Sequence, residues 1–331
     1  MRIVITECDH DAFDEEKAVA ASAGVDLVIA QSGSPQEVVA DASGADGIVV
    51  QYARITGDIM DALPSVRVIG RYGVGVDTID VQAATARGIA VCNVPDYGTE
   101  AVSDHAVALT LAAAREIPRL DRALREGRVD FPGVRPLHVV GDRVFGVVGL
   151  GRIGFATARK AAGLGYRVIC HDILAGDDEL YRGYPHVSLT ELLRRSQVVS
   201  LHTPLTELTH HLIGADELAL MRPDAILVNT ARGPVVDTAA LVEALRAGRI
   251  RSAALDVTEV EPLPRDHELT TLPQVVLTPH MAWYSEETYG ELKRRAVQNV
   301  ATLLRGGRPQ DIVNPEVLGA PGRNERPVPT P

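Results

Sequence analysis

The sequence has little of what membrane, nucleic-acid-binding and disulfide-rich proteins need. It contains 3 cysteines in 331 residues, no cluster of lysine and arginine, and a net charge of −11. No segment approaches the roughly 18 apolar residues of a membrane span, and the N-terminal residues lack the apolar stretch of a signal peptide. We therefore expect neither a nucleic acid nor a membrane as a partner, and the composition predicts a soluble, cytoplasmic protein.

The three cysteines, Cys8, Cys92 and Cys170, lie on or beside apolar runs of the strand type and show no metal-ligand spacing. We interpret them as reduced, buried thiols, and we expect no metal site. Hydrophobic residues make up 46% of the chain, which is enough for two domains that each have a core.

The most informative feature that is present is a glycine motif in the middle of the chain, Gly149, Gly151 and Gly154. An apolar run at residues 144–148 precedes it and a helical pattern at 152–164 follows it, which is the context that a dinucleotide-binding fingerprint requires. Gly149 permits a tight turn, Gly151 lets the backbone approach a pyrophosphate, and Gly154 lets helix and strand pack closely. An ordinary glycine-rich turn is the weaker interpretation, because strand, helix and a downstream acid occur together.

That acid is Asp172, which follows a second expected strand at residues 166–170. A carboxylate at this place accepts hydrogen bonds from the adenosine ribose and repels a 2′-phosphate. Ile173 and Leu174 add no cation that would favour NADP. The sequence therefore predicts NAD as the cofactor.

Strand-like runs alternate with helical stretches along the whole chain, which predicts an α/β protein with parallel sheets. A long apolar helix is expected at residues 100–115 with Thr99 as its cap, and a final helix at 285–304 with Ser285 as its cap. The expected strands are residues 2–6, 25–30, 47–51, 66–70, 89–92, 144–148, 166–170, 198–201, 225–229, 252–256 and 275–278.

These elements predict two domains of Rossmann-like or flavodoxin-like type with a cleft between them. Residues 99–283 are expected to form the NAD-binding domain, because the glycine motif opens its first strand-to-helix turn. Residues 1–98 with 284–318 are expected to form the substrate domain, whose first strand no such motif follows. The proline-rich residues 319–331 are expected to be a disordered tail.

Three side chains that could perform chemistry follow strands of the second domain: Arg232, Glu261 and His280. An arginine fork holds a carboxylate, and a carboxylate beside a histidine favours the protonated imidazole. With the reduced cofactor, NADH, as the hydride donor, these are the groups needed to reduce a carbonyl next to a carboxylate. Each residue has a structural interpretation when taken singly, such as a solvated acidic loop for Glu261. The three together are a more specific indication of a catalytic site.

Several segments resemble signatures of the D-isomer-specific 2-hydroxyacid dehydrogenases, in the order and spacing of that family. They are residues 72–77, 93–95, 229–233, 256–262 and 279–280, with the glycine motif ahead of the last three. The resemblance implies an enzyme that interconverts a 2-oxo acid and a D-2-hydroxy acid by hydride transfer. The L-specific lactate and malate enzymes are excluded, because their glycine motif opens the chain.

The resemblance also implies roles for individual residues. Arg232 and the backbone at Val74 and Gly75 are expected to hold the substrate carboxylate, His280 to protonate the carbonyl oxygen, and Glu261 to tune the histidine. Such a family is expected to form homodimers through the cofactor domains. The expected cofactor-binding residues, including the glycine motif, are Thr99, Gly149, Gly151, Arg152, Ile153, Gly154, Asp172, His202, Thr203, Pro204, Thr230, Ala231 and Asp256.

Within the family, the closer resemblance is to the C-terminal binding proteins, which are NADH-binding transcriptional corepressors. It rests on residues 51–56, 71–75 and 281–286. By this resemblance Tyr52, Arg71 and Trp283 line the substrate pocket. Their structural alternatives are a core aromatic for Trp283 and a surface ion pair for Arg71.

Four arginines, Arg54, Arg71, Arg135 and Arg232, carry more positive charge than the binding of a simple 2-oxo acid requires. This excess predicts a substrate with a second anionic group, such as a phosphonate or a distal carboxylate.

Two other functions stay open from the sequence. One is an NADH-responsive binding protein with little turnover, against which the complete set of Arg232, Glu261 and His280 argues. The other is a phosphite dehydrogenase, which the expected aromatic pocket of Tyr52 and Trp283 disfavours because phosphite is so small.

Overall fold

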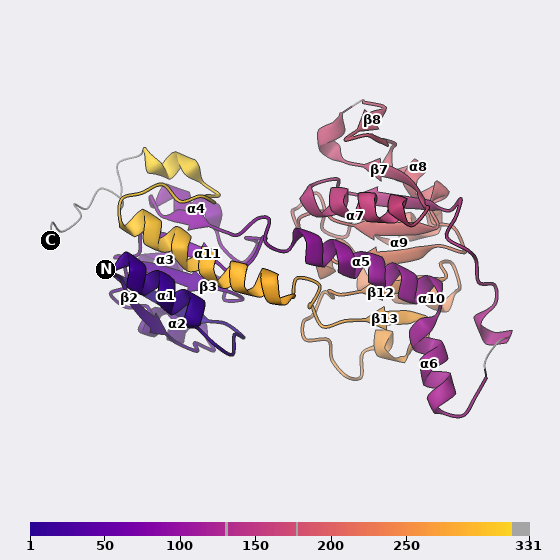
Figure 1. The fold of residues 1–331 in the computed structure, drawn as a ribbon, viewed down its shortest axis with the longest axis horizontal. Coiled ribbons are helices and arrows are strands. Elements are labelled where there is room, and N and C mark those ends of the chain that lie inside the picture. Colours follow the sequence, from indigo (N-terminus) through magenta and orange to yellow (C-terminus); the bar gives the residue numbers. More distant parts are fainter. Residues whose placement is uncertain (130–131, 177, 320–331) are drawn as a thin grey trace. The chain divides into compact units, whose positions relative to one another are not determined.

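The computed structural model describes residues 1–129, 132–176 and 178–319, which divide into two compact units (Figure 1). The first unit is Met1–Gly98 together with Ser285–Pro331, and the second unit is Thr99–Tyr284. Each is built around one parallel sheet, as predicted. The tail expected at residues 319–331 lies, from residue 320 on, outside the described residues. Within the described part of the chain, no helix combines the length and apolar character that spanning a membrane requires.

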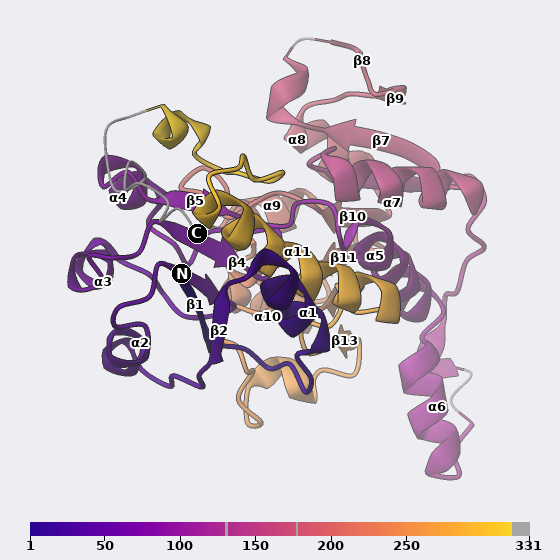
Figure 2. The ribbon, with the colours of Figure 1, turned by 60° about the vertical axis from the view of Figure 1, so that its left-hand side comes forward.

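The first unit contains a five-stranded sheet in the order β2-β1-β3-β4-β5. Its strands are β1 (Arg2–Glu7), β2 (Asp26–Ile29), β3 (Gly47–Val50), β4 (Val68–Arg71) and β5 (Ala90–Cys92). Its helices are α1 (Asp14–Ala23), α2 (Pro35–Asp41), α3 (Gly57–Ala62), α4 (Val81–Ala86) and α11 (Glu286–Leu304). Figure 2 shows α2, α3 and α4 on one side of this sheet and α1 and α11 on the other. The strands are near-continuous apolar runs because both faces of the sheet are covered.

Helix α11 packs directly on β3 and β4 because glycine occupies one position in each strand. A Cβ added at Gly47 or at Gly70 would lie 2.7 Å from a methyl of Val300. Ser285 caps the helix, as predicted, by accepting a hydrogen bond from the amide of Thr288 at 3.2 Å. Helix α11 therefore completes the core of the first sheet.

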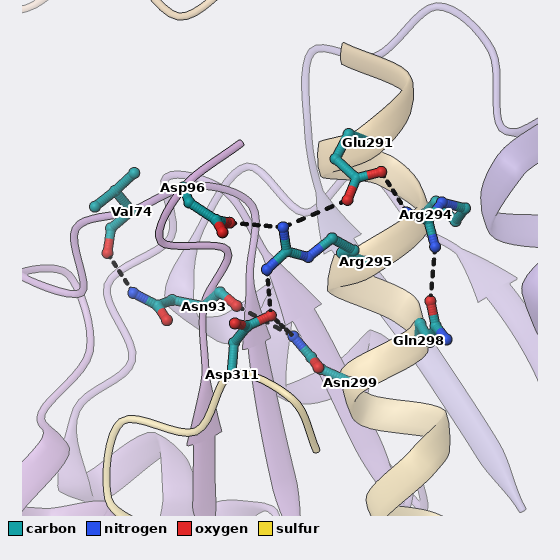
Figure 3. Close-up of polar contacts among 9 residues, drawn as sticks. All are labelled: Val74, Asn93, Asp96, Glu291, Arg294, Arg295, Gln298, Asn299 and Asp311. Carbon is teal, nitrogen blue, oxygen red and sulfur yellow. Dashed lines mark hydrogen bonds and ion pairs between the residues drawn. The ribbon is translucent and has the colours of Figure 1, made fainter. Parts of the chain in front are cut away.

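A buried arginine on α11 joins three segments of the first unit (Figure 3). Arg295 Nη1 lies 2.6 Å from Asp96 Oδ1, and its Nη2 lies 2.7 Å from Asp311 Oδ2. Burial works to lower the pKa of Arg295, but the hydrogen bonds to Asp311 and Asp96 outweigh it and raise the pKa. The loop after β5 and the segment after α11 are thus held to the same helix.

The second unit contains a six-stranded sheet in the order β13-β12-β11-β10-β6-β7. Its strands are β6 (Val144–Val148), β7 (Arg167–His171), β10 (Val198–Leu201), β11 (Ile226–Asn229), β12 (Ser252–Leu255) and β13 (Val275–Leu277). Its helices are α5 (Thr99–Ala114), α6 (Ile117–Arg125), α7 (Arg152–Gly163), α8 (Leu189–Arg195), α9 (Ala215–Leu220) and α10 (Thr238–Arg246). Helices α5 and α7 pack together against the sheet, and α9 packs on α8 and α10.

All eleven expected strands are present with bounds within two residues of those predicted. Two features differ. Thr99 is the first residue of α5 rather than its cap, and a short antiparallel pair, β8 (Leu180–Tyr181) and β9 (Tyr184–Pro185), was not predicted. Two-residue strands are too short to show an alternating pattern, so the sequence carries no signal for them.

Candidate active site

In the second sheet, β7 lies on one side of β6, and β10 to β13 follow one another on the other side. The direction in which strands are added therefore reverses between the neighbours β6 and β10. In open α/β sheets ligands bind outside the carboxyl ends of the strands at such a switch point. The glycine motif follows β6, and His202, Thr203 and Pro204 follow β10. The topology therefore brings these two predicted groups to one place.

Each glycine of the motif meets a different requirement. Gly149 has a φ of +86°, and a Cβ there would lie 2.8 Å from the carbonyl oxygen of His202. A Cβ at Gly154 would lie 1.9 Å from the carbonyl oxygen of Gly149, so α7 could not pack so closely on the turn. Gly151 faces open space and is the N-cap of α7, whose first amides receive no side-chain cap. These amides are available to an anion, with the helix dipole behind them.

Asp172 lies after β7 and is tied to the glycine turn. Its Oδ2 accepts a hydrogen bond from the amide of Leu150 at 2.7 Å, and its Oδ1 accepts one from Leu174 at 2.9 Å. Each carboxylate oxygen has a second lone pair, which suits a ribose hydroxyl. The side chains of Ile173 and Leu174 beside it are 76% and 80% exposed.

Buried polar atoms collect at the carboxyl ends of β10 and β11. Among the described residues, Thr203 Oγ1, Thr230 Oγ1 and His202 Nδ1 are buried without a hydrogen-bond partner, as is Thr99 Oγ1 at the start of α5. An unpaired buried hydroxyl costs about 1–3 kcal/mol, so such atoms indicate a polar ligand. Burial lowers the pKa of His202 to about 3, so its ring is neutral near pH 7. The residues present therefore fit a nicotinamide dinucleotide.

His280 and Glu261 meet at the carboxyl ends of β12 and β13. His280 Nδ1 lies 2.7 Å from Glu261 Oε2, and Glu261 Oε1 accepts the amide of Thr258 at 3.0 Å. Burial works to raise the pKa of Glu261, but the hydrogen bond and charge of His280, the Thr258 amide and the charge of Arg232 together lower it. An ionised carboxylate only accepts, so Nδ1 of His280 carries the hydrogen and Nε2 is left for a substrate.

The backbone of His280 is strained and is held by Asp256. Its φ is +56°, in the left-handed region that non-glycine residues rarely occupy. Its amide donates to the carbonyl oxygen of Asp256 at 2.7 Å. The Asp256 carboxylate, in a residue only 2% exposed, accepts the amides of Met281 and Ala282, both at 3.0 Å. Asp256, expected as a cofactor contact, thus fixes the loop that carries the histidine.

Arg232 lies on a turn after β11, and Asn229 in the same sequence segment, residues 229–233, stabilises this turn. Asn229 accepts the amide of Ala231 at 3.0 Å and donates to the carbonyl oxygen of Arg232 at 2.9 Å. A Cβ at Gly233 would lie 2.0 Å from the carbonyl group of Thr258. The turn with Arg232 and the loop with Glu261 are therefore in backbone contact, which brings the three predicted residues of the second unit together.

The predicted substrate residues of the first unit lie at the end of β4 and on the loops after β3 and β4. Tyr52 donates its hydroxyl hydrogen to Asp9 Oδ2 at 2.9 Å. Burial and Asp9 raise the pKa of Tyr52, and the nearby charge of Arg71 works in the opposite direction. Val74 is fixed by Asn93, whose side-chain amide donates to the Val74 carbonyl oxygen at 2.6 Å (Figure 3). Gly75 follows Val74 on the same loop.

Sequence reasoning missed two acids, Glu7 at the end of β1 and Asp9 just after it, although an acid at the carboxyl end of a strand is a signal in itself. Glu7 accepts three successive backbone amides, those of residues 51–53, at 2.8 to 3.0 Å. Asp9 accepts from Tyr52 and, at 2.7 Å, from the side chain of Gln51. These acids hold the loop that carries Tyr52.

The four arginines do not form one set. Arg54 and Arg135 are exposed. Arg135 precedes Pro136, whose carbonyl oxygen accepts a hydrogen bond from Arg251 at 2.6 Å. Arg251 precedes β12, so this segment lies at the amino end of the sheet, opposite to Arg232. Trp283 is half-buried and packs edge-on against Tyr284, with ring centroids 5.7 Å apart.

Comparison with known proteins agrees with this geometry. Residues 107–282 match the family described as D-isomer specific 2-hydroxyacid dehydrogenase, NAD binding domain. The chain is 44% identical to a glyoxylate reductase of Korarchaeum cryptofilum, over 80% of this chain and 81% of that one. It is 38% identical to a D-3-phosphoglycerate dehydrogenase of Methanocaldococcus jannaschii, over 87% of this chain and 55% of that one. The solved D-lactate dehydrogenase of Aquifex aeolicus, complexed with NAD and lactic acid, is similar with a TM-score of 0.83 at 27% identity, over 94% of this chain and 99% of that one.

Proposed function

Because the chain belongs to the D-isomer specific 2-hydroxyacid dehydrogenase family, we propose that its substrate is a small 2-oxo acid of the glyoxylate type. The chain is an oxidoreductase that interconverts 2-oxo acids and D-2-hydroxy acids with a nicotinamide dinucleotide. The observation that carries our assignment of residues is the 2.7 Å pair of His280 and Glu261, beside the turn that holds Arg232.

The chain's own residues have three tasks in this reaction, for which the bound nicotinamide supplies or takes the hydride. Arg232 offers two parallel N–H donors to the substrate carboxylate. His280 Nε2 donates a proton to the carbonyl oxygen during reduction, and takes it from the hydroxyl in the reverse direction. Glu261 keeps the hydrogen on Nδ1 and stabilises the imidazolium, as a carboxylate does in other acid–base pairs with histidine.

We infer that NAD, rather than NADP, is the cofactor. The Asp172 carboxylate repels a 2′-phosphate, and the exposed Ile173 and Leu174 beside it carry no charge that would bind one. The proposed dinucleotide site also includes the start of α7 and the unpaired hydroxyls of Thr203 and Thr230.

In the same proposal Tyr52, Arg71 and Trp283 contact the substrate, and the backbone at Val74 and Gly75 binds its carboxylate. A second anionic group of the substrate would use Arg71, whose charge works to lower the pKa of the nearby Tyr52. The similarity to glyoxylate reductases instead favours a substrate with one carboxylate. The finer likeness to the C-terminal binding proteins rests on residues 51–56, 71–75 and 281–286 alone, and the relatives named above are instead glyoxylate reductases and D-3-phosphoglycerate dehydrogenases. A homodimer stays a prediction from the family.

The test is oxidation of NADH by the purified protein with glyoxylate, an aromatic 2-oxo acid, a dicarboxylic 2-oxo acid and a phosphorylated one. We expect the highest kcat/KM for glyoxylate or another small monoanion, and a D-configured product where the product is chiral. Faster turnover of the phosphorylated acid would support the second-anion alternative. Tight NADH binding without turnover of any 2-oxo acid would contradict the proposal and favour an NADH-responsive binding protein.

A further inference from the structure

The loop of residues 257–262 carries Glu261 but has no helix or strand of its own. Two of its hydrogen bonds are internal: Thr258 donates its amide to Glu261 Oε1, and its hydroxyl to the carbonyl oxygen of Val260 at 2.8 Å. Internal bonds shape a loop but do not place it relative to its surroundings. Its position must come from contacts with neighbouring elements.

Glu259 makes two such contacts, one with each carboxylate oxygen. Its Oε1 lies 2.7 Å from His211 Nε2, and its Oε2 accepts the amide of Thr238 at 2.8 Å. Thr238 is the first residue of α10, where the amide has no partner within the helix. The carboxylate therefore joins the loop to the start of a helix and to a histidine 48 residues away in the sequence.

The histidine is itself held in place. His211 has a φ of +51°, and its amide donates to the carbonyl oxygen of Pro234 at 2.8 Å. Its Nδ1 lies 3.8 Å from Asp237 Oδ2, and Asp237 in turn caps α10 by accepting the amide of Ala240. The side chain that binds Glu259 is thus anchored on the segment that follows Arg232.

The protonation state of this contact follows from its surroundings. Burial works to raise the pKa of Glu259, but hydrogen bonds from Thr238 and His211 and the charge of His211 lower it. The carboxylate is ionised near pH 7 and only accepts, so Nε2 of His211 carries the hydrogen. The bond then persists whether the ring is neutral or charged.

We propose that Glu259 and His211 are positioning residues for the acid–base pair, fixing loop 257–262 so that Glu261 meets His280 at hydrogen-bonding distance. This rests on the proposed function of His280 as the proton donor. The close contact of Gly233 with Thr258 sets how near the loop lies to the Arg232 turn. At the next residue, Glu259, two hydrogen bonds fix the orientation of the loop. Glu261 lies two residues after Glu259.

The first experiment compares Glu259→Ala and His211→Ala with Glu243→Ala, a control on α10 whose side chain is 78% exposed. We expect kcat to fall by about 10- to 100-fold in the first two, as for other displacements of catalytic groups, with NADH affinity retained. The basic limb of the pH–rate profile should move to lower pH, because Glu261 no longer stabilises the imidazolium. The double variant should be no slower than Glu259→Ala, because Glu259→Ala already removes the contact with His211 as well as the one with Thr238.

The conservative variant Glu259→Gln keeps an oxygen that can accept one of the two hydrogen bonds. We expect it to recover most of the activity that Glu259→Ala loses. The proposal is overturned if Glu259→Ala keeps kcat within about twofold of the parent, or if its pH–rate profile does not move while only its melting temperature falls.

A measurement without substrate separates this inference from the proposed function. The Nδ1 proton of His280, hydrogen-bonded to Glu261, should give a downfield NMR signal that is absent in His280→Gln. Loss of that signal in Glu259→Ala supports the positioning role even if no 2-oxo acid is turned over, an outcome that would remove the proposed function alone. An unchanged signal overturns the positioning role whatever the turnover.

Discussion

Glu261 and His280 are joined by a 2.7 Å hydrogen bond, although each lies on a loop after a different strand. The histidine reaches this contact with a φ of +56°, a conformation that the buried carboxylate of Asp256 maintains through two amides of the same loop. Strained backbone of this kind persists only where surrounding contacts fix it. Here the contacts fix the ring that our proposal makes the proton donor.

Replacing His280 by glutamine removes that proton donor while keeping a polar side chain of similar size. We expect kcat for reduction to fall by about 10² to 10⁴, the usual range for a general acid. Steady-state kinetics with glyoxylate and NADH fluorescence titration check this, and NADH affinity should stay near that of the parent. A loss of less than about tenfold would remove His280 from this role.

Arg232→Lys tests whether the guanidinium fork binds the substrate carboxylate. A lysine keeps the charge but offers no pair of parallel donors, so we expect kcat/KM to fall by about 10²-fold, mainly through a higher KM. Arg246→Lys on the surface of α10 is the matched control. Equal values for the two variants would show that the fork at Arg232 is not used.

Cofactor choice should depend on Asp172. The double variant Asp172→Ser with Leu174→Arg removes the repelling carboxylate and adds a phosphate-binding cation, so kcat/KM for NADPH should rise by at least about tenfold. The ratio of kcat/KM values for NADPH and NADH measures this. Leu180→Arg, which adds the same charge at another exposed position, should leave the ratio unchanged.

The stability of the second unit should fall on acidification, in part through Glu261. The pKa of Glu261 lies below its usual value of 4.5. The stability that it contributes is therefore fully present above pH 4.5 and is lost as the pH falls through the lowered pKa of the folded state. Calorimetry should show Glu261→Gln melting below the parent at pH 7, with the difference shrinking as the pH falls below 4.5. A constant difference at all pH values would contradict this.

Arg295→Leu should destabilise the first unit, because it leaves Asp311 as an unpaired charge in a residue whose side chain is 9% exposed. Removing one partner of a buried ion pair typically costs about 3–5 kcal/mol. Chemical denaturation measures the loss, and adding Asp311→Asn to Arg295→Leu should restore part of it. If the double variant is less stable than Arg295→Leu alone, the ion pair is not the cause.

Most of the sheet architecture could be predicted, because strands such as residues 144–148 are short runs of buried apolar side chains between turn residues. The glycine turn after β6 could be predicted for a related reason: Gly149, Gly151 and Gly154 meet backbone requirements that lie within a few residues of one another. The β8–β9 pair could not, since two residues on each side show no periodicity.

The details of the acid–base site depend on contacts that no local pattern encodes. His211 and Glu259 are 48 residues apart, and each resembles an ordinary surface residue in the sequence. Charge alone groups Arg135 with Arg232, but Arg135 lies at the opposite end of the sheet. The sequence gives no signal for the contacts of Glu7 and Asp9, because their partners, residues 51–53, lie on the loop after another strand, β3. Only the folded chain brings such groups together.

Helix α11 packs on β3 and β4 but is synthesised long after them, so the first sheet stays uncovered on this face while the chain grows. The ribosome makes the whole of Thr99–Tyr284 before it reaches this helix. At bacterial to eukaryotic translation rates the first sheet therefore waits roughly 10–40 s for its cover. During that interval the face around Gly47 and Gly70 is a bare apolar surface. A chain that ended between residues 284 and 304 would contain all of the second unit but lack part or all of the helix that covers this face of the first sheet.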